Sequence, residues 1–497
     1  MKKKLIALFL LVVMMATMLA SCNTNPADTM EGAGLGGPSE PGEEVPDLLP
    51  EGSWYDGYEF TFLISGNFSN NDFKYEEGDE SVVNQAKYKI ISGIAEKYGV
   101  AIVTDNVIKF GSSTGSGTGF NKMATQYQST STEYDAAMIG TYDVSTAAYN
   151  GYLTDMNSDI LPHLDLYKSW WDQRANDSLM IDSKMFYTTG DISLTDNIIT
   201  NCIMFNKDII AEKEDMLNPY ELVRSNKWTW DNFITEVRKV TEDLDGNDKM
   251  DFNDRYGLLT WNDAFLASFS SARESFAIIN DNNEAELSVY TQRSAAMVAK
   301  YIELIKSTDT VYNYQTNLKS SEWDPTRIAM FDNNQAAYYM TTFNTVPKHR
   351  NSDTDFGILP FPKLAEDQEN YGHLVSAYHC QFVCVPYHIE DPELVGGILE
   401  ELAYEGKRQM TPAYYDQTLI GKVVRDDESV EMLDIIFASA MYDIGIYYKI
   451  GGLIDTVMSM ASSKQDQFSS YYNALRPAAL ADIKNINSMF KEVLGEE

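Results

Sequence analysis

The chain has 497 residues, of which 44% are hydrophobic and 12% aromatic, enough to bury a sizeable core and to form two domains or lobes. This composition excludes a disordered or fibrous protein. The 74 acidic residues outnumber the 38 basic residues, and the formal net charge is −36. Such a surface repels phosphate backbones and anionic lipid head groups, so the charge disfavours nucleic-acid binding and favours a neutral or cationic partner.

The amino-terminal segment predicts export from the cytoplasm. Residues 1–22 read MKKKLIALFLLVVMMATMLASC, with three lysines before an apolar run and small residues before Cys22. This pattern is typical of a secretory signal peptide and is short for a bilayer span. The ending LASC resembles a bacterial lipobox, in which the cysteine is acylated and becomes the first mature residue. We therefore expect Cys22 to be a lipid anchor on the outer side of the cell membrane; the alternative is an ordinary cleaved leader with a chance cysteine.

Residues 23–51 predict a disordered tether between the membrane and the folded body. The stretch has no basic or aromatic residue and is rich in Gly, Pro, Asp and Glu. Such a composition cannot bury enough apolar surface to fold.

Strand-like and helix-like segments alternate at the start of the folded body. The pattern predicts strands at 59–64, 101–107 and 136–139, and helices at 83–98 and 120–128. This βαβαβ order predicts an α/β fold with a parallel sheet. Ligands of open α/β sheets bind beyond the carboxyl ends of the strands, so the loops 66–73, 140–143 and 188–191 are the candidate ligand loops.

A later helix is predicted in the segment WTWDNFITEVRKV. Thr229 is a plausible N-cap, and apolar residues then recur at helical spacing. Trp228 and Trp230 flank the cap, and we expect both to pack into the core.

The segment DLDGNDKMDFND, residues 243–254, matches the spacing of a calcium-binding loop. Oxygen ligands fall at positions 1, 3, 5, 9 and 12, and a backbone carbonyl falls at position 7. The predicted ligands are Asp243, Asp245, Asn247, Lys249, Asp251 and Asp254. Asp248 stands where glycine normally makes the turn, and Asp254 is shorter than the usual glutamate, so a solvated acidic turn is the alternative to structural calcium.

Motifs for catalysis are missing from the sequence. The five histidines form no HExxH or other close metal pattern, and the run GSSTGSGTG at 111–119 lacks the Lys-Ser/Thr pair of a phosphate loop. Cys202, Cys380 and Cys384 imply no disulfide framework, although Cys380 and Cys384 could pair across a turn. We therefore expect a binding protein that is not an enzyme and needs no cofactor to bind its ligand.

Aromatic residues favour a carbohydrate ligand. The chain has 31 Tyr, 22 Phe and 7 Trp. The flat C–H faces of sugar rings stack on aromatic rings, and their hydroxyl groups bond to carboxylates, amides and backbone groups.

Several segments, in chain order, resemble the extracellular solute-binding proteins, family 1, which serve sugar-importing ABC transporters. The resemblance covers nearly all of residues 52–497 and is carried by YDAAMIGTYDV, LYKSWWDQRANDSLMIDSKMFYTTGDI, NCIMFNKDII, WTWDNFITEVRKVTEDLDGNDKMD, MFDNNQAAYYMTT and DFGILPFPK.

This resemblance implies the type II periplasmic-binding-protein fold, with two α/β lobes joined by crossing hinge segments that trap ligand between them. The implied crossings lie near Ile192–Cys202, Tyr378–Val385 and Tyr442–Ile450. One lobe would hold 52–195 plus 385–443, and the other 196–384 plus 444–497.

The resemblance also implies where ligand residues lie, namely in loops at strand ends and on aromatic residues near the crossings. The candidates are Asn67, Tyr142, Asp143, Trp170, Asp191, Trp261, Phe343, Tyr378, Tyr447 and Tyr448. Phe343 stands where sugar-binding relatives often carry tryptophan.

We therefore expect a monomeric, extracytoplasmic, lipid-anchored protein that captures a carbohydrate and delivers it to ABC permease subunits in the membrane. The family resemblance implies that this carbohydrate is an oligosaccharide. A secreted lipoprotein resembling a glycoside hydrolase is the alternative from another class. A sensor partner that presents ligand to a membrane receptor is a third hypothesis.

Overall fold

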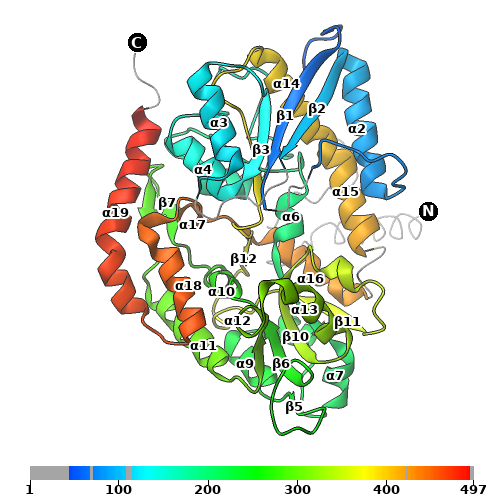
Figure 1. Cartoon of the computed structure of the whole chain (residues 1–497), viewed down its shortest axis with the longest axis vertical. Helices are drawn as coiled ribbons and strands as arrows, with labels where there is room; N and C mark the ends of the chain where they lie inside the picture. The colour runs from blue at the N-terminus through cyan, green and yellow to red at the C-terminus, as the bar shows by residue number, and fades with distance from the viewer. Residues whose placement is uncertain (1–43, 68–70, 108–114, 421–423, 425, 493–497) are drawn as a thin grey trace, which may run out of the picture. The chain divides into compact units, whose positions relative to one another are not determined.

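The computed structural model describes residues 44–67, 71–107, 115–420, 424 and 426–492. Two main β-sheets, each flanked by helices, make up this part of the chain (Figure 1). The α/β class predicted from the sequence is confirmed.

The first sheet contains the predicted βαβαβ start. Its strands, in the order β13-β3-β1-β2, are β13 (Gln381–Cys384), β3 (Ala136–Gly140), β1 (Tyr58–Ser65) and β2 (Val100–Val107). Strand β1 pairs in parallel with β2 and β3, as predicted, whereas β13 is antiparallel to β3. The carboxyl ends of β1 and β3 therefore lie side by side.

The helices of this half include the two predicted from the sequence, α2 (Val82–Tyr98) and α3 (Thr118–Ser129). The others are α4 (Thr141–Tyr149), α5 (Gln173–Leu179), α14 (Pro392–Glu405) and α15 (Thr411–Tyr414). Helix α2 begins at Ser81, whose side chain accepts a hydrogen bond from the Asn84 amide, and ends at Gly99 in the left-handed conformation with φ 65°.

The second sheet is mixed. Its strands are β11 (Phe356–Leu359), β4 (Asn201–Asn206), β10 (Ala336–Thr342), β6 (Arg255–Thr260), β5 (Thr241–Glu242) and β9 (Val311–Asn313). Strand β10 is buried along its whole length, antiparallel to β4 and parallel to β6. An almost unbroken apolar strand is expected when both faces of a sheet are covered.

The second half also contains most of the remaining helices. They are α7 (Lys207–Glu212), α8 (Pro219–Arg224), α9 (Trp230–Val237), α10 (Ala264–Ser271), α11 (Gln292–Lys306), α12 (Tyr314–Asn317), α13 (Trp323–Asp332), α16 (Asp427–Ala438), α18 (Leu453–Ser463) and α19 (Phe468–Glu492). Thr229 caps α9 through its hydroxyl oxygen, and Trp228 and Trp230 are fully buried, so these predictions are confirmed.

Three segments of the described chain lie between the two halves. They contain α6 (Thr195–Ile199), β12 (His373–Leu374) and β14 (Ala440–Met441) with the short helix α17 (Ile444–Tyr447). Strands β12 and β14 pair in parallel, and Thr200 pairs with Val375, so the segments run against one another. In Figure 1, α6, β12 and α17 lie between the two sheets.

The three described cysteines are buried free thiols. Cys380 and Cys384 do not form the disulfide that a turn could have allowed. Cys384 lies on β13 and Cys380 directly precedes this strand, so an extended backbone separates them.

Candidate functional site

One cavity of about 200 Å³ opens between the two halves. Tyr142 reaches it from the end of β3, Asp263 from the end of β6, and Tyr378 from the segment after β12. Asn201 and Lys449 also line it. Side chains that follow strands of both sheets thus meet at one point, which is where an open α/β sheet binds ligand.

A second cavity, of about 240 Å³, adjoins the first. Tyr149 of α4, Tyr447 and Tyr448 line it, and Tyr142 and Lys449 line both cavities. The Tyr447 hydroxyl is buried and has no hydrogen-bond partner among the described residues. A ligand hydroxyl group reaching this oxygen would supply the missing bond.

Lys449 separates the two cavities. Its ammonium group lies 5.4 Å from the centroid of the Tyr142 ring and 3.2 Å from an oxygen of Asp455. The backbone of Lys449 is left-handed, with φ 50°. An ammonium over a phenol ring is attracted by the negative face of the ring, so the contact links residues from the two sides of the first cavity.

Sequence reasoning missed five polar residues of the first cavity, namely Asn201, Asp263, Ser376, Lys449 and Asp455. Asp263 directly precedes α10, but its carboxylate makes no capping hydrogen bond. Burial raises its pKa to about 6. Asn201 donates a hydrogen bond of 2.7 Å to the Leu374 carbonyl oxygen, while its own side-chain oxygen is buried without a partner in the described structure. The position of Asp263 shortly after a strand is the sequence signal that could have identified it. From the sequence, we expected the ligand role after this strand at Trp261 instead.

The structure brings Asn67 and Tyr378 together. The amide group of Asn67 donates a hydrogen bond to the Tyr378 carbonyl oxygen. The Tyr378 side chain is 38% exposed and lines the first cavity. Of the candidates predicted from sequence, Tyr142, Tyr378, Tyr447 and Tyr448 line the two cavities, and Asn67 supports one of them.

Two predicted acidic residues are engaged elsewhere. Asp143 accepts a 2.8 Å hydrogen bond from the Gly117 amide and thereby holds the turn before α3. Asp191 accepts a hydrogen bond of 2.5 Å from the Thr411 hydroxyl, and burial raises its pKa to about 7. Neither residue lines the two cavities described above.

Three predicted aromatic residues are packed into the interior. Trp170 is 1% exposed and lies edge-on to Tyr404. Phe343 is fully buried and stacks on Phe437 with ring centroids 4.7 Å apart. Trp261 is 6% exposed. The contacts of Trp170 and Phe343 are those of core residues, and we leave all three out of the ligand set proposed below.

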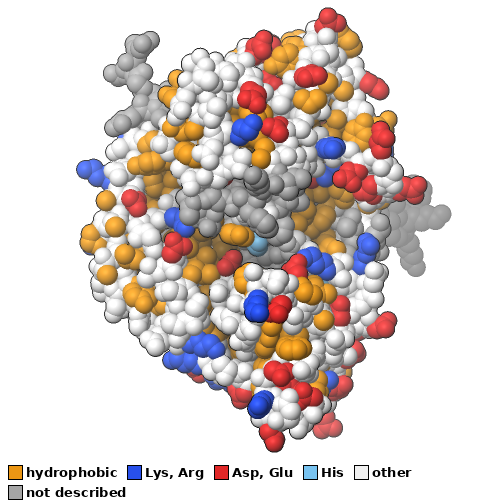
Figure 2. All heavy atoms as spheres, viewed as in Figure 1, with side chains coloured by type: hydrophobic (Ala, Val, Ile, Leu, Met, Phe, Trp, Pro, Cys, Tyr) orange, Lys and Arg blue, Asp and Glu red, His pale blue; other side chains and the backbone are white. Residues whose placement is uncertain are grey.

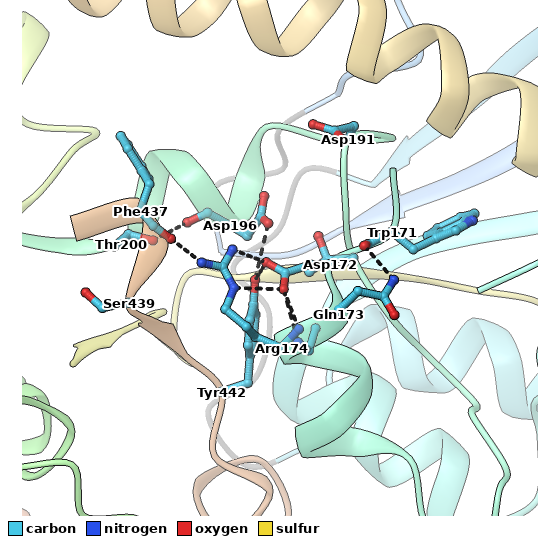
Figure 3. A network of polar contacts seen from close by, with 12 residues as sticks. Trp171, Asp172, Gln173, Arg174, Asp191, Asp196, Thr200, Phe437, Ser439 and Tyr442 are labelled. Carbon is cyan, nitrogen blue, oxygen red and sulfur yellow. Dashed lines mark hydrogen bonds and ion pairs between the residues drawn. The ribbon is translucent and has the colours of Figure 1, made fainter. Parts of the chain in front are cut away.

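A buried polar network lies beside the connecting segments (Figure 3). Asp172 caps α5 and forms a 2.7 Å ion pair with Arg174. The Tyr442 hydroxyl lies 2.9 Å from Asp172 and 3.3 Å from Asp196. Burial, and then the charge of Asp172, raise the pKa of Asp196 to about 8. Asp196 therefore holds a proton at neutral pH.

The predicted calcium loop brings three carboxylates together. Ligand atoms of Asp243, Asp245 and Asp254 lie within 4.8 Å of one another. Asp248 takes the left-handed conformation, φ 57°, that its position in the loop requires. Asp254 is fully buried and accepts hydrogen bonds from the amides of Leu244 and Asp251.

Cys22 and most of the predicted tether lie outside the described residues. Among the described helices, none combines the length and the apolar character that a membrane crossing requires. On the face viewed in Figure 2, acidic side chains are scattered over both halves with lysine and arginine dispersed among them.

Comparisons with known proteins agree with this architecture. The family model described as bacterial extracellular solute-binding protein matches residues 83–378. No protein in a search of curated sequences matches significantly.

Solved structures show the same fold at low identity. A maltose/maltodextrin-binding domain from Bdellovibrio bacteriovorus, bound to maltotriose, is 12% identical with a TM-score of 0.50, over 87% of this chain and 99% of that one. An ABC substrate-binding protein from Listeria monocytogenes, in complex with cycloalternan, is 13% identical with a TM-score of 0.50, over 88% and 100%. UspC from M. tuberculosis is 12% identical with a TM-score of 0.53, over 85% and 100%. The two-lobe periplasmic-binding-protein fold predicted from the sequence is confirmed.

Proposed function

Because the chain belongs to the bacterial extracellular solute-binding proteins, we propose that it captures a carbohydrate between its two lobes and delivers it to an ABC permease. The observation that carries this proposal is the pair of adjoining cavities that meet at Tyr142 and Lys449. They are lined by aromatic rings and by polar groups that lack partners, which suits a ligand with flat apolar faces and many hydroxyl groups.

Binding proceeds without chemistry on the ligand. Tyr142, Tyr378 and Asp263 come from different segments around the cavity, so a sugar that touches all of them favours the closed arrangement of the lobes. Ligand binding then shifts the protein towards the closed form by the difference in affinity between the two forms.

We propose lobes close to those predicted from the sequence, 52–195 plus 385–443 and 196–384 plus 444–497, with two changes. Helix α16 (Asp427–Ala438) packs on β11 of the second sheet, where the Ser429 hydroxyl oxygen accepts a 3.0 Å hydrogen bond from the Ile358 amide, so α16 belongs to the second lobe. Strand β13 (Gln381–Cys384) pairs with β3 of the first sheet. The second boundary therefore belongs before Gln381, and the chain crosses between the sheets at β12 rather than after it.

Three further features complete the proposal. Cys22 carries the lipid that holds the protein outside the cell membrane, the protein acts as a monomer, and its partners are the permease subunits. The LASC motif supports the lipid anchor.

We also propose that the loop 243–254 holds a structural calcium ion. The ligand spacing and the approach of Asp243, Asp245 and Asp254 support this site. The ion would stabilise the loop and would take no part in sugar binding.

Isothermal titration against maltodextrins, cellodextrins and other oligosaccharides tests the function. Heat of binding with one ligand per protein, and recovery of that ligand unchanged by chromatography, are the expected results. Hydrolysis products would favour the glycoside hydrolase alternative. The absence of binding heat for every saccharide would reject the carbohydrate proposal.

A further inference from the structure

The carboxylate of Asp263 is the least compensated charge in the first cavity. It lines the cavity, and none of the hydrogen bonds or ion pairs of the described structure engages it. Burial alone raises its pKa to about 6, without any opposing basic group. Asp263 is partly accessible from the cavity, and at pH 7 the ionised form of its carboxylate predominates without a basic partner in the described structure.

The other polar groups of this cavity do not correct the imbalance. Lys449 lies 3.2 Å from Asp455, so its charge is already offset by that carboxylate. The side-chain oxygen of Asn201 is a second buried acceptor without a donor in the described structure. With Asp263 ionised, the charges of Asp263, Lys449 and Asp455 sum to one negative charge. The cavity therefore has hydrogen-bond acceptors that lack donors.

The aromatic lining also suits a cation. Tyr142 already holds an ammonium group, that of Lys449, at 5.4 Å from its ring centroid. The Tyr378 ring is partly exposed at the same cavity. Phenol rings beside a carboxylate attract cations through the negative faces of the rings. The formal net charge of −36 further raises the local concentration of cationic solutes.

We propose that the ligand is a saccharide bearing a protonated amine, which pairs with the Asp263 carboxylate in the first cavity. The inference rests on the proposed function and narrows it from carbohydrates in general to amino sugars and their oligomers. The ammonium group supplies the missing donors to Asp263 and to the Asn201 oxygen, and the sugar ring stacks on the tyrosines.

Matched saccharides test this inference. Glucosamine, galactosamine and β1,4-linked glucosamine oligomers are titrated at pH 7 beside their N-acetylated forms and the corresponding neutral sugars, including cellodextrins. Each set differs in one substituent, so the amine is the variable. We expect at least one amine-bearing member to bind at least tenfold more tightly than its N-acetylated and neutral counterparts.

Substitutions of Asp263 test whether the ligand amine binds at this carboxylate. Asp263→Asn should abolish the tenfold preference, and Asp263→Glu should restore part of it. Asp281→Asn makes the same change in net charge at an exposed residue and should leave the preference intact. Circular dichroism confirms that each variant is folded, and Asp263→Glu keeps the test valid if Asp263→Asn is unstable.

The outcomes separate the two proposals. Tight binding of neutral or acetylated sugars without an amine preference would overturn the inference and leave the proposed function standing. An amine preference that survives in Asp263→Asn would also overturn it. If no saccharide binds the wild-type protein, the proposed function fails and the inference fails with it.

Discussion

The ammonium group of Lys449 lies over the Tyr142 ring, 5.4 Å from its centroid, at the boundary between two cavities. Lys449 follows α17 on a connecting segment, whereas Tyr142 follows β3 of the first sheet. One side chain therefore joins a connecting segment to a lobe.

Lys449→Met should lower the free energy of unfolding by about 0.5–1 kcal/mol, because it removes the cation–π contact and the ion pair with Asp455. Chemical denaturation measures the change. Lys449→Arg keeps the charge and should restore most of the stability. Equal stability of the Met and wild-type proteins would show that the contact contributes nothing.

The network around Asp196 predicts a pH dependence of stability. The pKa of Asp196 is raised to about 8 in the folded protein, above its value near 4 in an unfolded chain. The folded state then binds the proton more tightly, so the contribution of Asp196 to stability is full below about pH 4 and is lost as the pH rises through 8. Burial raises this pKa most, the charges of Asp172 and Asp191 raise it further, and the charge of Arg174 lowers it.

Asp196→Asn removes this titration and mimics the protonated form. The melting temperature of the wild-type protein should therefore fall relative to that of the variant between pH 5 and pH 9. Asp177→Asn, at an exposed position of α5, is the matched control and should follow the wild type. Parallel curves for wild type and Asp196→Asn would contradict the raised pKa.

Phe343 and Tyr378 should differ in what their removal affects. Phe343 is fully buried against Phe437, so Phe343→Ala should destabilise the protein by about 3–5 kcal/mol. Tyr378 is partly exposed at the first cavity, so Tyr378→Ala should weaken ligand binding about tenfold and change stability by less than about 1 kcal/mol. Denaturation and titration of both variants distinguish the roles, and a purely affinity-related defect in Phe343→Ala would return this residue to the ligand set.

The elements at the start of the fold could be predicted from local patterns. Ser81 and Gly99 mark the ends of α2, and the apolar segments before and after it are the parallel strands β1 and β2. These signals lie within a few residues of one another, so no knowledge of distant contacts is needed.

The site depends on contacts that a single sequence does not display. Aromatic residues serve both cores and sugar sites, and only the packing of Phe343 on Phe437 separates it from Tyr378. Asp263 is one acidic residue among 74 Asp and Glu, and its lack of a partner is visible only when the segments around it are in place. The antiparallel strand β13 joins the first sheet from far along the chain, which displaced the expected lobe boundary.

The last prediction concerns the loop 243–254. Calcium added to protein treated with a chelator should raise the melting temperature by a few degrees, because an ion that binds only the folded state stabilises it by mass action, about 2.7 kcal/mol at one hundred times the dissociation constant. Asp245→Asn should reduce the shift, since Asp245 is one of three carboxylates whose oxygens approach within 4.8 Å. Asp243 is less suitable for substitution, because it also accepts backbone hydrogen bonds from Gly246 and Asp248 that hold the loop.

Magnesium is the matched ion for this experiment, since it demands a tighter octahedral arrangement and releases water reluctantly. Asp281→Asn again controls for net charge. A shift of equal size with magnesium, or one that persists in Asp245→Asn, would indicate general screening of the acidic surface rather than a site in the loop. Sugar affinity should be the same with and without calcium, because the loop residues are absent from the lining of both cavities at Tyr142 and Lys449.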